Sequence, residues 1–439
     1  MTQGNTESSY AGLLKQWYTS KPVEDVTFKD NPFLALVPKS ENVTGITFQQ
    51  PVIYGQGQGS AAISNFSTAQ TMGTLTGTNS VQFTIPRVGW MGSASMAMET
   101  YLSTIGDRGA FIDASTQVID GLLANQGVDL SRELYADGSG ARAQVGNSSF
   151  STSVLTLTVP DNSVFFEVGM QLDVAAAEFT GAIRAYGSAG HGLYVIAVDY
   201  QLNTVTVGVS PVPGATPCNL NDSTNGIPTI AQGDYIFRTG DRSTTGATTG
   251  LATVGLAGWL PYGGPQAGDS FFGVNRTSSP QRLAGLSMDA TTFPLLEEAL
   301  VEAVSRVARL GGEITHFFMP YKKFTDLQKS AYAKGIVVLG KNSLGVDMPQ
   351  IGFSGLAFAG PKGIVKIIPD RSCPANRIYG LKLSAWQYNS LKKAINIFKE
   401  DGNLMLRQAT DSGLEIRGWR LGNLACNEPR SNIVLNVNP

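Results

Sequence analysis

The chain has 439 residues, of which 42% are apolar and only 15% are charged. This length allows two or three domains of ordinary size, and the apolar fraction is sufficient for a buried core. The formal net charge of −2 argues against a dedicated nucleic-acid binder, which usually carries a strong basic excess. No stretch approaches the roughly 20 apolar residues that span a bilayer, so we expect no membrane partner.

Charge is distributed unevenly along the chain. Residues 1–321 carry 15 basic and 26 acidic side chains, whereas residues 322–439 carry 17 and 8. This segregation favours contacts in which an acidic surface of one copy meets a basic surface of the next, and chance partition between domains is the alternative explanation.

The cysteines and the N-terminus bear on the cellular compartment. Cys218, Cys373 and Cys426 are too few and too scattered for a disulfide framework or a zinc site, so we interpret them as small buried residues. No basic segment followed by an apolar run occurs at the N-terminus, so no secretory signal is expected. These features indicate assembly in a cytoplasm.

The first 90 residues predict an arm followed by a long hairpin. In residues 1–45, a short amphipathic helix around Tyr10–Trp17 precedes an extended apolar segment at 30–38. In residues 46–90, alternating apolar residues predict two strands joined by a flexible tip at about 55–80. A lone hairpin is marginal in water, so this one needs a supporting surface, and a neighbouring subunit is the obvious candidate.

The next two segments differ sharply in pattern. Residues 91–147 contain a predicted helix over 107–136, about 45 Å long at 1.5 Å per residue, which would act as a strut. Residues 148–245 show short alternating runs separated by glycine-rich turns, which predict an inserted small β-barrel or sandwich domain.

The last part of the chain is predicted to be α+β. Residues 246–311 form a glycine-rich connector and a helix from about 293 to 310. Residues 312–403 contain a buried strand at 314–319, a helix that Pro320 opens, and further strands. Residues 404–439 are predicted to form strands, at 404–410, 414–421 and 433–437.

The residues that usually carry catalysis are scarce. His191 lies in a glycine-flanked turn and His316 in an apolar strand, so we interpret them as a loop and a core residue. The segment 335–342 resembles a phosphate-binding loop, but Asn342 stands where Ser or Thr would hold magnesium, and its Ile-Val-Val-Leu centre is typical of a strand. We therefore predict no catalytic, cofactor-binding or metal-binding residues, and no enzyme.

Several strings, and above all their order, resemble the Hong Kong 97-type major capsid proteins of tailed bacteriophages. These strings are Asp30-Asn31-Pro32-Phe33-Leu34-Ala35, Glu133-Leu134-Tyr135-Ala136-Asp137-Gly138-Ser139-Gly140, Arg371-Ser372-Cys373-Pro374-Ala375-Asn376-Arg377-Ile378-Tyr379-Gly380 and Gly413-Leu414-Glu415-Ile416-Arg417-Gly418-Trp419. The likeness covers nearly the whole chain except the insertion.

The resemblance implies an α+β Hong Kong 97-type capsid fold with an inserted small β-barrel or sandwich domain. Residues 1–45 would be the N-terminal arm and 46–90 the extended loop that lies on the adjacent subunit. Residues 91–147 would be the peripheral domain with its spine helix, and 246–311 a connector and a peripheral-domain helix. Residues 312–403 would form the axial domain, and 404–439 strands that return to both domains. Intersubunit contacts are expected at Trp17, Phe33, Leu34, Tyr54, Gly57 and Gly59.

By the same resemblance, the function is mechanical. Pentamers and hexamers of the chain would tile an icosahedral head that encloses packaged double-stranded DNA, without sequence-specific DNA binding. A portal protein and a decoration protein would be partners in the virion. The chain would be assembled in the host cytoplasm.

Two departures from the family limit what carries over. Some members link subunits through a Lys of the extended loop, but no Lys occurs between Lys39 and Lys322, so this cross-link is not expected. Some members carry a long N-terminal scaffolding segment, whereas only a few residues precede Tyr10, so a separate scaffolding protein is the better hypothesis.

Three rival functions stay open at this stage. An encapsulin-like nanocompartment shares the fold, and a phage tail or receptor-binding protein would explain the composition and the β-rich insertion. A hydrolase built on the C-terminal part is the third, and the scarcity of histidine argues against it.

Overall fold

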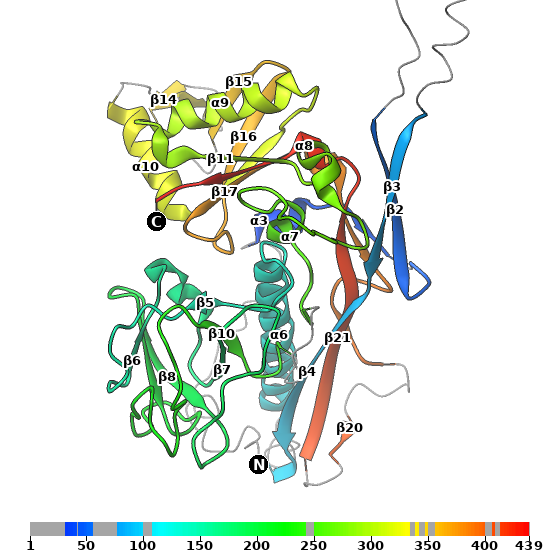
Figure 1. The fold of residues 1–439 in the computed structure, drawn as a ribbon. Helices are drawn as coiled ribbons and strands as arrows, with labels where there is room; N and C mark the ends of the chain where they lie inside the picture. The colour runs from blue at the N-terminus through cyan, green and yellow to red at the C-terminus, as the bar shows by residue number, and fades with distance from the viewer. Residues whose placement is uncertain are drawn as a thin grey trace, which may run out of the picture.

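The computed structural model describes ten stretches of the chain, and their arrangement is drawn in Figure 1. They are residues 31–41, 43–55, 77–99, 108–242, 250–333, 339–341, 347–349, 356–399, 406–408 and 413–438. The predicted helix at Tyr10–Trp17, most of the hairpin tip and most of the segment 335–342 lie outside these stretches.

The long helix α6 (Arg108–Glu133) is the strut predicted for residues 107–136. Every residue from Asp129 to Tyr135 is buried, so the helix is enclosed on all sides at its C-terminal end. Gly138 follows with a φ of 94°, a left-handed conformation that glycine adopts without strain. Figure 1 shows the insertion on one side of α6 and a pair of long strands on the other.

The insertion is a six-stranded antiparallel sheet with its own hydrophobic core, in the order β5-β10-β7-β8-β9-β6. Its strands are β5 (Ala143–Gln144), β6 (Val154–Thr156), β7 (Gln171–Ala175), β8 (Leu193–Asp199), β9 (Thr204–Gly208) and β10 (Tyr235–Arg238). An antiparallel bridge between Val145 and Leu157 joins the two outer strands, so the sheet closes on itself as a small barrel. The barrel begins at Ala143, slightly before the predicted boundary at residue 148.

A second six-stranded sheet holds the C-terminal part, in the order β11-β22-β17-β12-β16-β15. Its strands are β11 (Leu286–Asp289), β12 (His316–Met319), β15 (Leu356–Gly360), β16 (Gly363–Pro369), β17 (Arg377–Leu381) and β22 (Ile433–Asn436). Helices α9 (Leu296–Arg309) and α10 (Tyr321–Ala333) accompany it, close to the predicted helices.

The position of helix α9 differs from the predicted domain division. The prediction placed this helix with the peripheral domain, in residues 246–311. Its apolar stripe, which includes Ala303 and Val307, shares one core with Phe317 and Val365 of the second sheet. The helix therefore belongs with this sheet, because the stripe that the sequence predicts is the face that the sheet covers.

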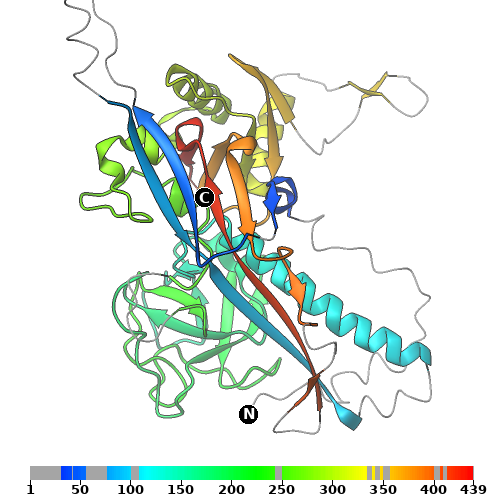
Figure 2. The same cartoon turned by 90° about the vertical axis from the view of Figure 1, so that its right-hand side faces the viewer.

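A third sheet is built on the long strand β21 (Gly413–Cys426). The strand β4 (Val88–Ala97) pairs with it antiparallel over ten residues. The other strands are β1 (Lys39–Ser40), β18 (Trp386–Ser390), β19 (Asn396–Ile397) and β20 (Leu406–Arg407). Figure 2 shows β4 and β21 running side by side along the lower half of the molecule. The predicted strands at 414–421 and 404–410 correspond to β21 and the shorter β20.

The segment 30–38, predicted to be extended, instead contains the short helix α3 (Pro32–Leu36). Pro32 suits the first helical position, where its missing N–H is not needed. The amide N–H of Phe33 donates to the buried carboxylate of Asp370, at 3.1 Å. This acceptor lies 337 positions away along the chain, so local sequence could not indicate the helix.

A buried ion pair connects α6 to β21 and provides a test of the fold. Glu133 Oε1 lies 2.6 Å from Arg420 Nη2, and both side chains are almost fully buried. We expect Glu133→Gln to lower the free energy of unfolding by about 3–5 kcal/mol, because it leaves the Arg420 charge buried without its partner. Denaturant unfolding measures this loss.

The matched control is Glu302→Gln, which breaks an exposed Glu–Arg pair with Arg306 on α9. The same chemical change should there cost less than about 1 kcal/mol. Equal losses for the two variants would contradict the structural role assigned to the buried pair.

Candidate intersubunit surfaces and the interdomain cavity

The strands β2 (Thr47–Gly55) and β3 (Asn79–Pro86) form the predicted hairpin, which lies along one side of the molecule (Figure 1). Side chains alternate between its two faces, as strand geometry requires. Phe48, Val52, Phe83 and Ile85 are buried on the inner face. The hairpin therefore has one apolar face that the chain itself covers.

An aromatic cluster of the same chain supports the inner face of the hairpin. The ring of Phe83 lies 5.1 Å from that of Trp259, centroid to centroid, and the two meet edge to face. Trp259 Nε1 donates to the carbonyl of Leu424 in β21. The amide of Thr84 donates to the carbonyl of Phe272 at 3.0 Å. These contacts fix the direction in which the hairpin leaves the body.

The outer face of the hairpin carries no charged side chain in either strand. It consists of small polar and apolar residues: Thr47, Gln49, Pro51, Ile53, Ser80, Gln82, Thr84 and Pro86. Ile53 is 68% exposed, and the neighbouring Ile46 is 79% exposed. Such a face can bind another protein surface through shape and apolar contact, since it holds no charge that would have to be desolvated.

The predicted contact residues have different fates in the structure. Tyr54 is half-buried at the end of β2 and packs against the hydrophobic core that contains Tyr135, Trp259 and Leu424. Phe33 and Leu34 are fully buried in that core, where the Phe33 ring lies 5.3 Å from Tyr135 and 5.1 Å from Phe318. Because these two side chains have no exposed surface left, we revise their role to stabilisation of the chain itself.

Trp17, Gly57 and Gly59 lie outside the described residues. The outward residues Ile46 and Ile53 were missed as contact candidates. Strand alternation was the signal that could have found Ile53: once Phe48 and Val52 face inward, Ile53 must face outward.

A cluster of buried charges joins α6 to the insertion. Asp129 of α6 lies 2.9 Å from Arg142 and 2.5 Å from Arg238, nitrogen to oxygen, and Arg238 also reaches Asp241 at 2.9 Å. Burial opposes the ionisation of Asp129, but the guanidinium groups of Arg142, Arg238 and Arg132 lower its pKa to about 2. Asp129 therefore remains ionised at neutral pH, and its ion pairs with Arg142 and Arg238 hold the barrel against the helix.

A cavity of about 220 Å³ lies beside this cluster, where α6, the insertion and β17 meet. Asp137, from the turn after α6, and Glu178, from the insertion, both line it. Burial first, and the neighbouring charge of Asp137 second, raise the pKa of Glu178 to about 7. The junction thus contains a carboxyl group that titrates near neutral pH.

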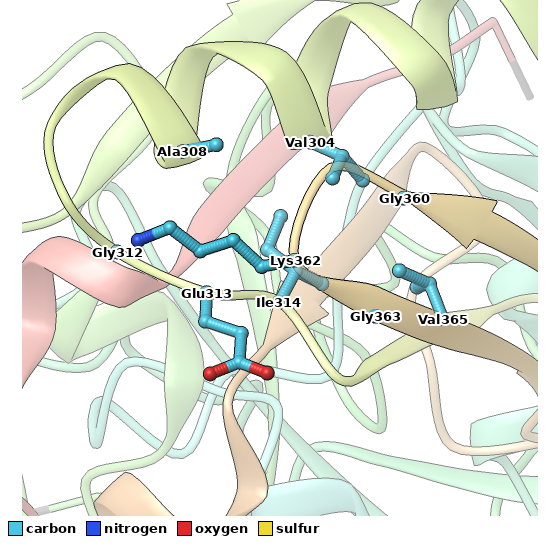
Figure 3. Close-up of a pocket in the computed structure, with 9 residues that line it drawn as sticks. All are labelled: Val304, Ala308, Gly312, Glu313, Ile314, Gly360, Lys362, Gly363 and Val365. Carbon is cyan, nitrogen blue, oxygen red and sulfur yellow. The ribbon is translucent and has the colours of Figure 1, made fainter.

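A second cavity lies between α9 and the turn that joins β15 to β16, and it is shown in Figure 3. Its volume of about 10 Å³ holds no more than one water molecule. Lys362 Nζ donates to the carbonyl of Gly311 at 2.9 Å, at the end of α9. This arrangement closes a helix end and offers no room for a substrate.

The chemically reactive side chains are dispersed. The three cysteines are free and buried, as predicted, and burial raises the pKa of each thiol, which disfavours the nucleophilic thiolate. His316 is partly buried in β12, as expected, and burial and Lys366 lower its pKa. Within the described residues, no three His, Cys, Asp or Glu side chains are grouped so that they could hold a metal ion.

The segment 335–342 is described only in part. Leu339–Lys341 form the strand β13, which pairs with β14 (Asp347–Pro349), in agreement with the interpretation of this segment as a strand. As for membranes, none of the helices that the structure describes is long and apolar enough to cross one.

Comparison with solved structures shows the fold. The capsid asymmetric unit of Cyanophage A-1(L) is 11% identical and superposes with a TM-score of 0.50, over 98% of this chain and 99% of that chain. The capsid of a native GTA particle is 10% identical over 99% of both chains, with a TM-score of 0.43. The encapsulin of Synechococcus elongatus PCC 7942 is 6% identical over 97% and 93%, with a TM-score of 0.42.

No protein-family model and no curated protein sequence matches the chain. The likeness to the cyanophage capsid protein therefore rests on structure, and it shows that the two chains share a fold over nearly their whole length. The predicted α+β fold, similar to that of a capsid protein, is confirmed at this level.

The elevated pKa of Glu178 predicts a pH-dependent stability. The ordinary pKa of a glutamate is about 4.5 and the value in the folded chain is about 7, so folding favours the protonated form. Stability should therefore fall as the pH rises from about 4.5 through 7. We expect Glu178→Gln to remove this part of the fall, measured as the midpoint of thermal unfolding between pH 5 and 8.

Glu167→Gln is the control, since Glu167 is an exposed glutamate of the same insertion. Its pH profile should match that of the unmodified chain. A Glu178→Gln profile that also matches would show that this carboxyl does not titrate in the expected range.

Proposed function

We propose that this chain is the major capsid protein of a tailed bacteriophage, and that many copies assemble into the icosahedral head shell. The observation that carries the proposal is the fold shared with the Cyanophage A-1(L) capsid protein over 98% of the chain. The uncharged outer face of the hairpin at the side of the body supports it, because such a face suits a contact with a second copy. In this function the chain is a structural component of the virion and not an enzyme.

The hairpin would be the extended loop that lies on the adjacent subunit. Its inner face is anchored on Trp259 and its neighbours, so the outer face is the part of the two described strands that is available for a partner. A repeated contact between two different surfaces closes into a ring, which suits pentamers and hexamers. The acidic first part and the basic last part of the chain favour such head-to-side contacts.

The domain roles follow from this proposal. Residues 1–45 would be the N-terminal arm, and α6 the spine of the peripheral domain. The second sheet with α9 and α10 would form the axial domain, and β21 with β4 would belong to the peripheral domain. The barrel would be an addition that takes no part in tiling.

The partners follow as well. A portal protein, a separate scaffolding protein and a decoration protein would complete the particle, which assembles in the host cytoplasm. Packaged double-stranded DNA would lie against the shell without sequence-specific contacts, in keeping with the net charge of −2.

Electron microscopy of the purified chain, expressed alone and with its neighbouring genes, tests the proposal. We expect closed icosahedral shells or capsomer rings, and DNA inside shells from an infected host. Shells that enclose a protein cargo would favour a nanocompartment. Monomers or elongated trimers in both preparations would favour a tail or receptor-binding protein.

A single substitution tests the role of the hairpin. We expect Ile53→Asp to prevent shell formation, because it puts a charge on the outer face that the contact would have to desolvate. Circular dichroism should show an intact fold. Leu202→Asp is the matched control, since Leu202 is a 71% exposed residue in a turn of the insertion, and its shells should form normally. Equal assembly by both variants would contradict the proposed contact.

We further propose that the barrel faces outward in the shell, because an inward barrel would occupy volume needed for DNA. Limited proteolysis of intact particles, followed by mass spectrometry, should find cuts in exposed turns of the insertion, such as the turn at 200–203 between β8 and β9. An insertion that is fully protected in the particle and cleaved in the free chain would contradict this orientation.

A further inference from the structure

The second sheet is covered by helices on one face. Its side chains alternate between the two faces, as in any strand. Val365 and Ile367 of β16 share one core with Val304 of α9, and Val304 and Val365 line the small cavity beside α9 in Figure 3. Phe324 and Leu327 of α10 belong to the same core. Both helices therefore pack on this one face of the sheet.

The opposite face of the same sheet is covered only in part. On the central strands, Phe318, Tyr379 and Val434 pack in the core that contains Trp259. Toward the edge formed by β15, the side chains on this face are exposed. They are Ala357, Ala359, Ile364 and Lys366.

These four exposed residues form one continuous patch. Ala359 lies directly opposite Ile364, and Ala357 lies directly opposite Lys366, in the antiparallel ladder between β15 and β16. Side chains that are opposite each other on one face of a sheet are in contact distance. Ile364 is 71% exposed, so the patch combines an apolar surface with the positive charge of Lys366.

The outer face of α9 has the complementary chemistry. Val301, near the middle of the helix, is 57% exposed, and the exposed Glu298 lies one turn before it on the same face. The neighbouring Glu302 is already paired with Arg306 at 2.8 Å. Glu298 is therefore the carboxylate of this face that suits a cation of another molecule.

A helix and an open sheet face are surfaces that pack together in layered domains. Within one chain the two surfaces cannot meet, because α9 covers one face of the sheet and the patch lies on the other. Between two copies they can meet, and the sheet of each copy would then have helices on both faces. A contact of this kind joins two different surfaces, so it can repeat around a ring.

We propose that the open face of β15 and β16 receives the outer face of α9 from a second copy, with Val301 against Ile364 and Glu298 beside Lys366. This contact rests on the proposed function, since it would join neighbouring axial domains of one ring. The charge distribution favours a second copy as the occupant. Glu298 belongs to the acidic first part of the chain, whereas Lys366 belongs to the basic last part.

Cross-linking between introduced cysteines tests the contact. One preparation carries Val301→Cys and another carries Ile364→Cys, and the three native cysteines are buried, so a short bismaleimide reacts at the introduced thiols. We expect cross-linked dimers when the two variants are mixed before assembly, and far fewer when either variant is alone. A chain with both substitutions should give a ladder of linked chains that ends at the size of the ring.

Charge reversal in the doubly substituted chain makes the test specific. Lys366→Glu should lower the cross-linked fraction by about tenfold or more, because two carboxylates then meet at the contact. Adding Glu298→Lys to that variant should restore the cross-links. Lys329→Glu is the matched control, since it makes the same charge change at an exposed residue of α10 outside both surfaces, and its cross-linking should be unchanged.

Electron microscopy of the same samples separates this contact from the shell function. Shells or rings without cross-links between positions 301 and 364 would overturn the contact and leave the shell function standing. Cross-links in a chain that forms no shell would support the contact and count against the shell function. The absence of both would count against both. Equal cross-linking by the Lys366→Glu and Lys329→Glu variants would also overturn the contact.

Discussion

The last turn of α6 is the constraint on which the arrangement of the molecule depends. Three charged residues near this end of the helix are buried, and each binds a different part of the chain. Asp129 binds the arginines of the barrel, Arg132 donates to the segment that enters it, and Glu133 binds Arg420 of β21 and the amide of Thr253. If α6 were to turn about its axis, all of these contacts would break together.

Buried ion pairs of this kind contribute little net stability, because desolvation offsets most of the attraction. What they provide is a strong penalty for any arrangement in which one partner is left alone. The three hydrophobic cores supply the stability, and the charges at the end of α6 determine how the cores are placed relative to one another. The placement of the hairpin depends indirectly on these charges, since the hairpin packs on Trp259, which is hydrogen-bonded to β21.

Periodic patterns in the sequence predicted the parts of the fold that local residues determine. The hairpin, the β-rich insertion, α9 and α10 appear close to the predicted positions, because each has a stripe or alternation of apolar residues, and the long helix α6 also appears close to its predicted position. The strand β4, with the sequence VGWMGSASMA, was missed because its small residues have weak strand propensity. Its antiparallel hydrogen bonding to β21 stabilises the strand instead.

The same limit applies to the site. Glu133 and Arg420 are 287 positions apart, and Asp129, Arg142 and Arg238 come from three elements. The sequence around each of these charged residues does not show which distant residue it pairs with. The outer face of the hairpin was accessible to prediction through strand alternation, whereas the burial of Phe33 and Leu34 depended on α3 docking against Tyr135 and Phe318.

The barrel enters and leaves the body at nearly the same point. The amide of Ala252 donates to the carbonyl of Gly138, and a Cβ on Gly250 would lie 1.6 Å from that same oxygen, so the two chain segments touch where only glycine fits. A domain attached through one such crossing can be exchanged in evolution for another of different length or fold without changing the rest of the subunit. Removal of the barrel would also remove Arg238, one of the two arginines that pair with the buried carboxylate of Asp129. The replacement domain would therefore have to supply a new partner for Asp129, or Asp129 would have to be substituted.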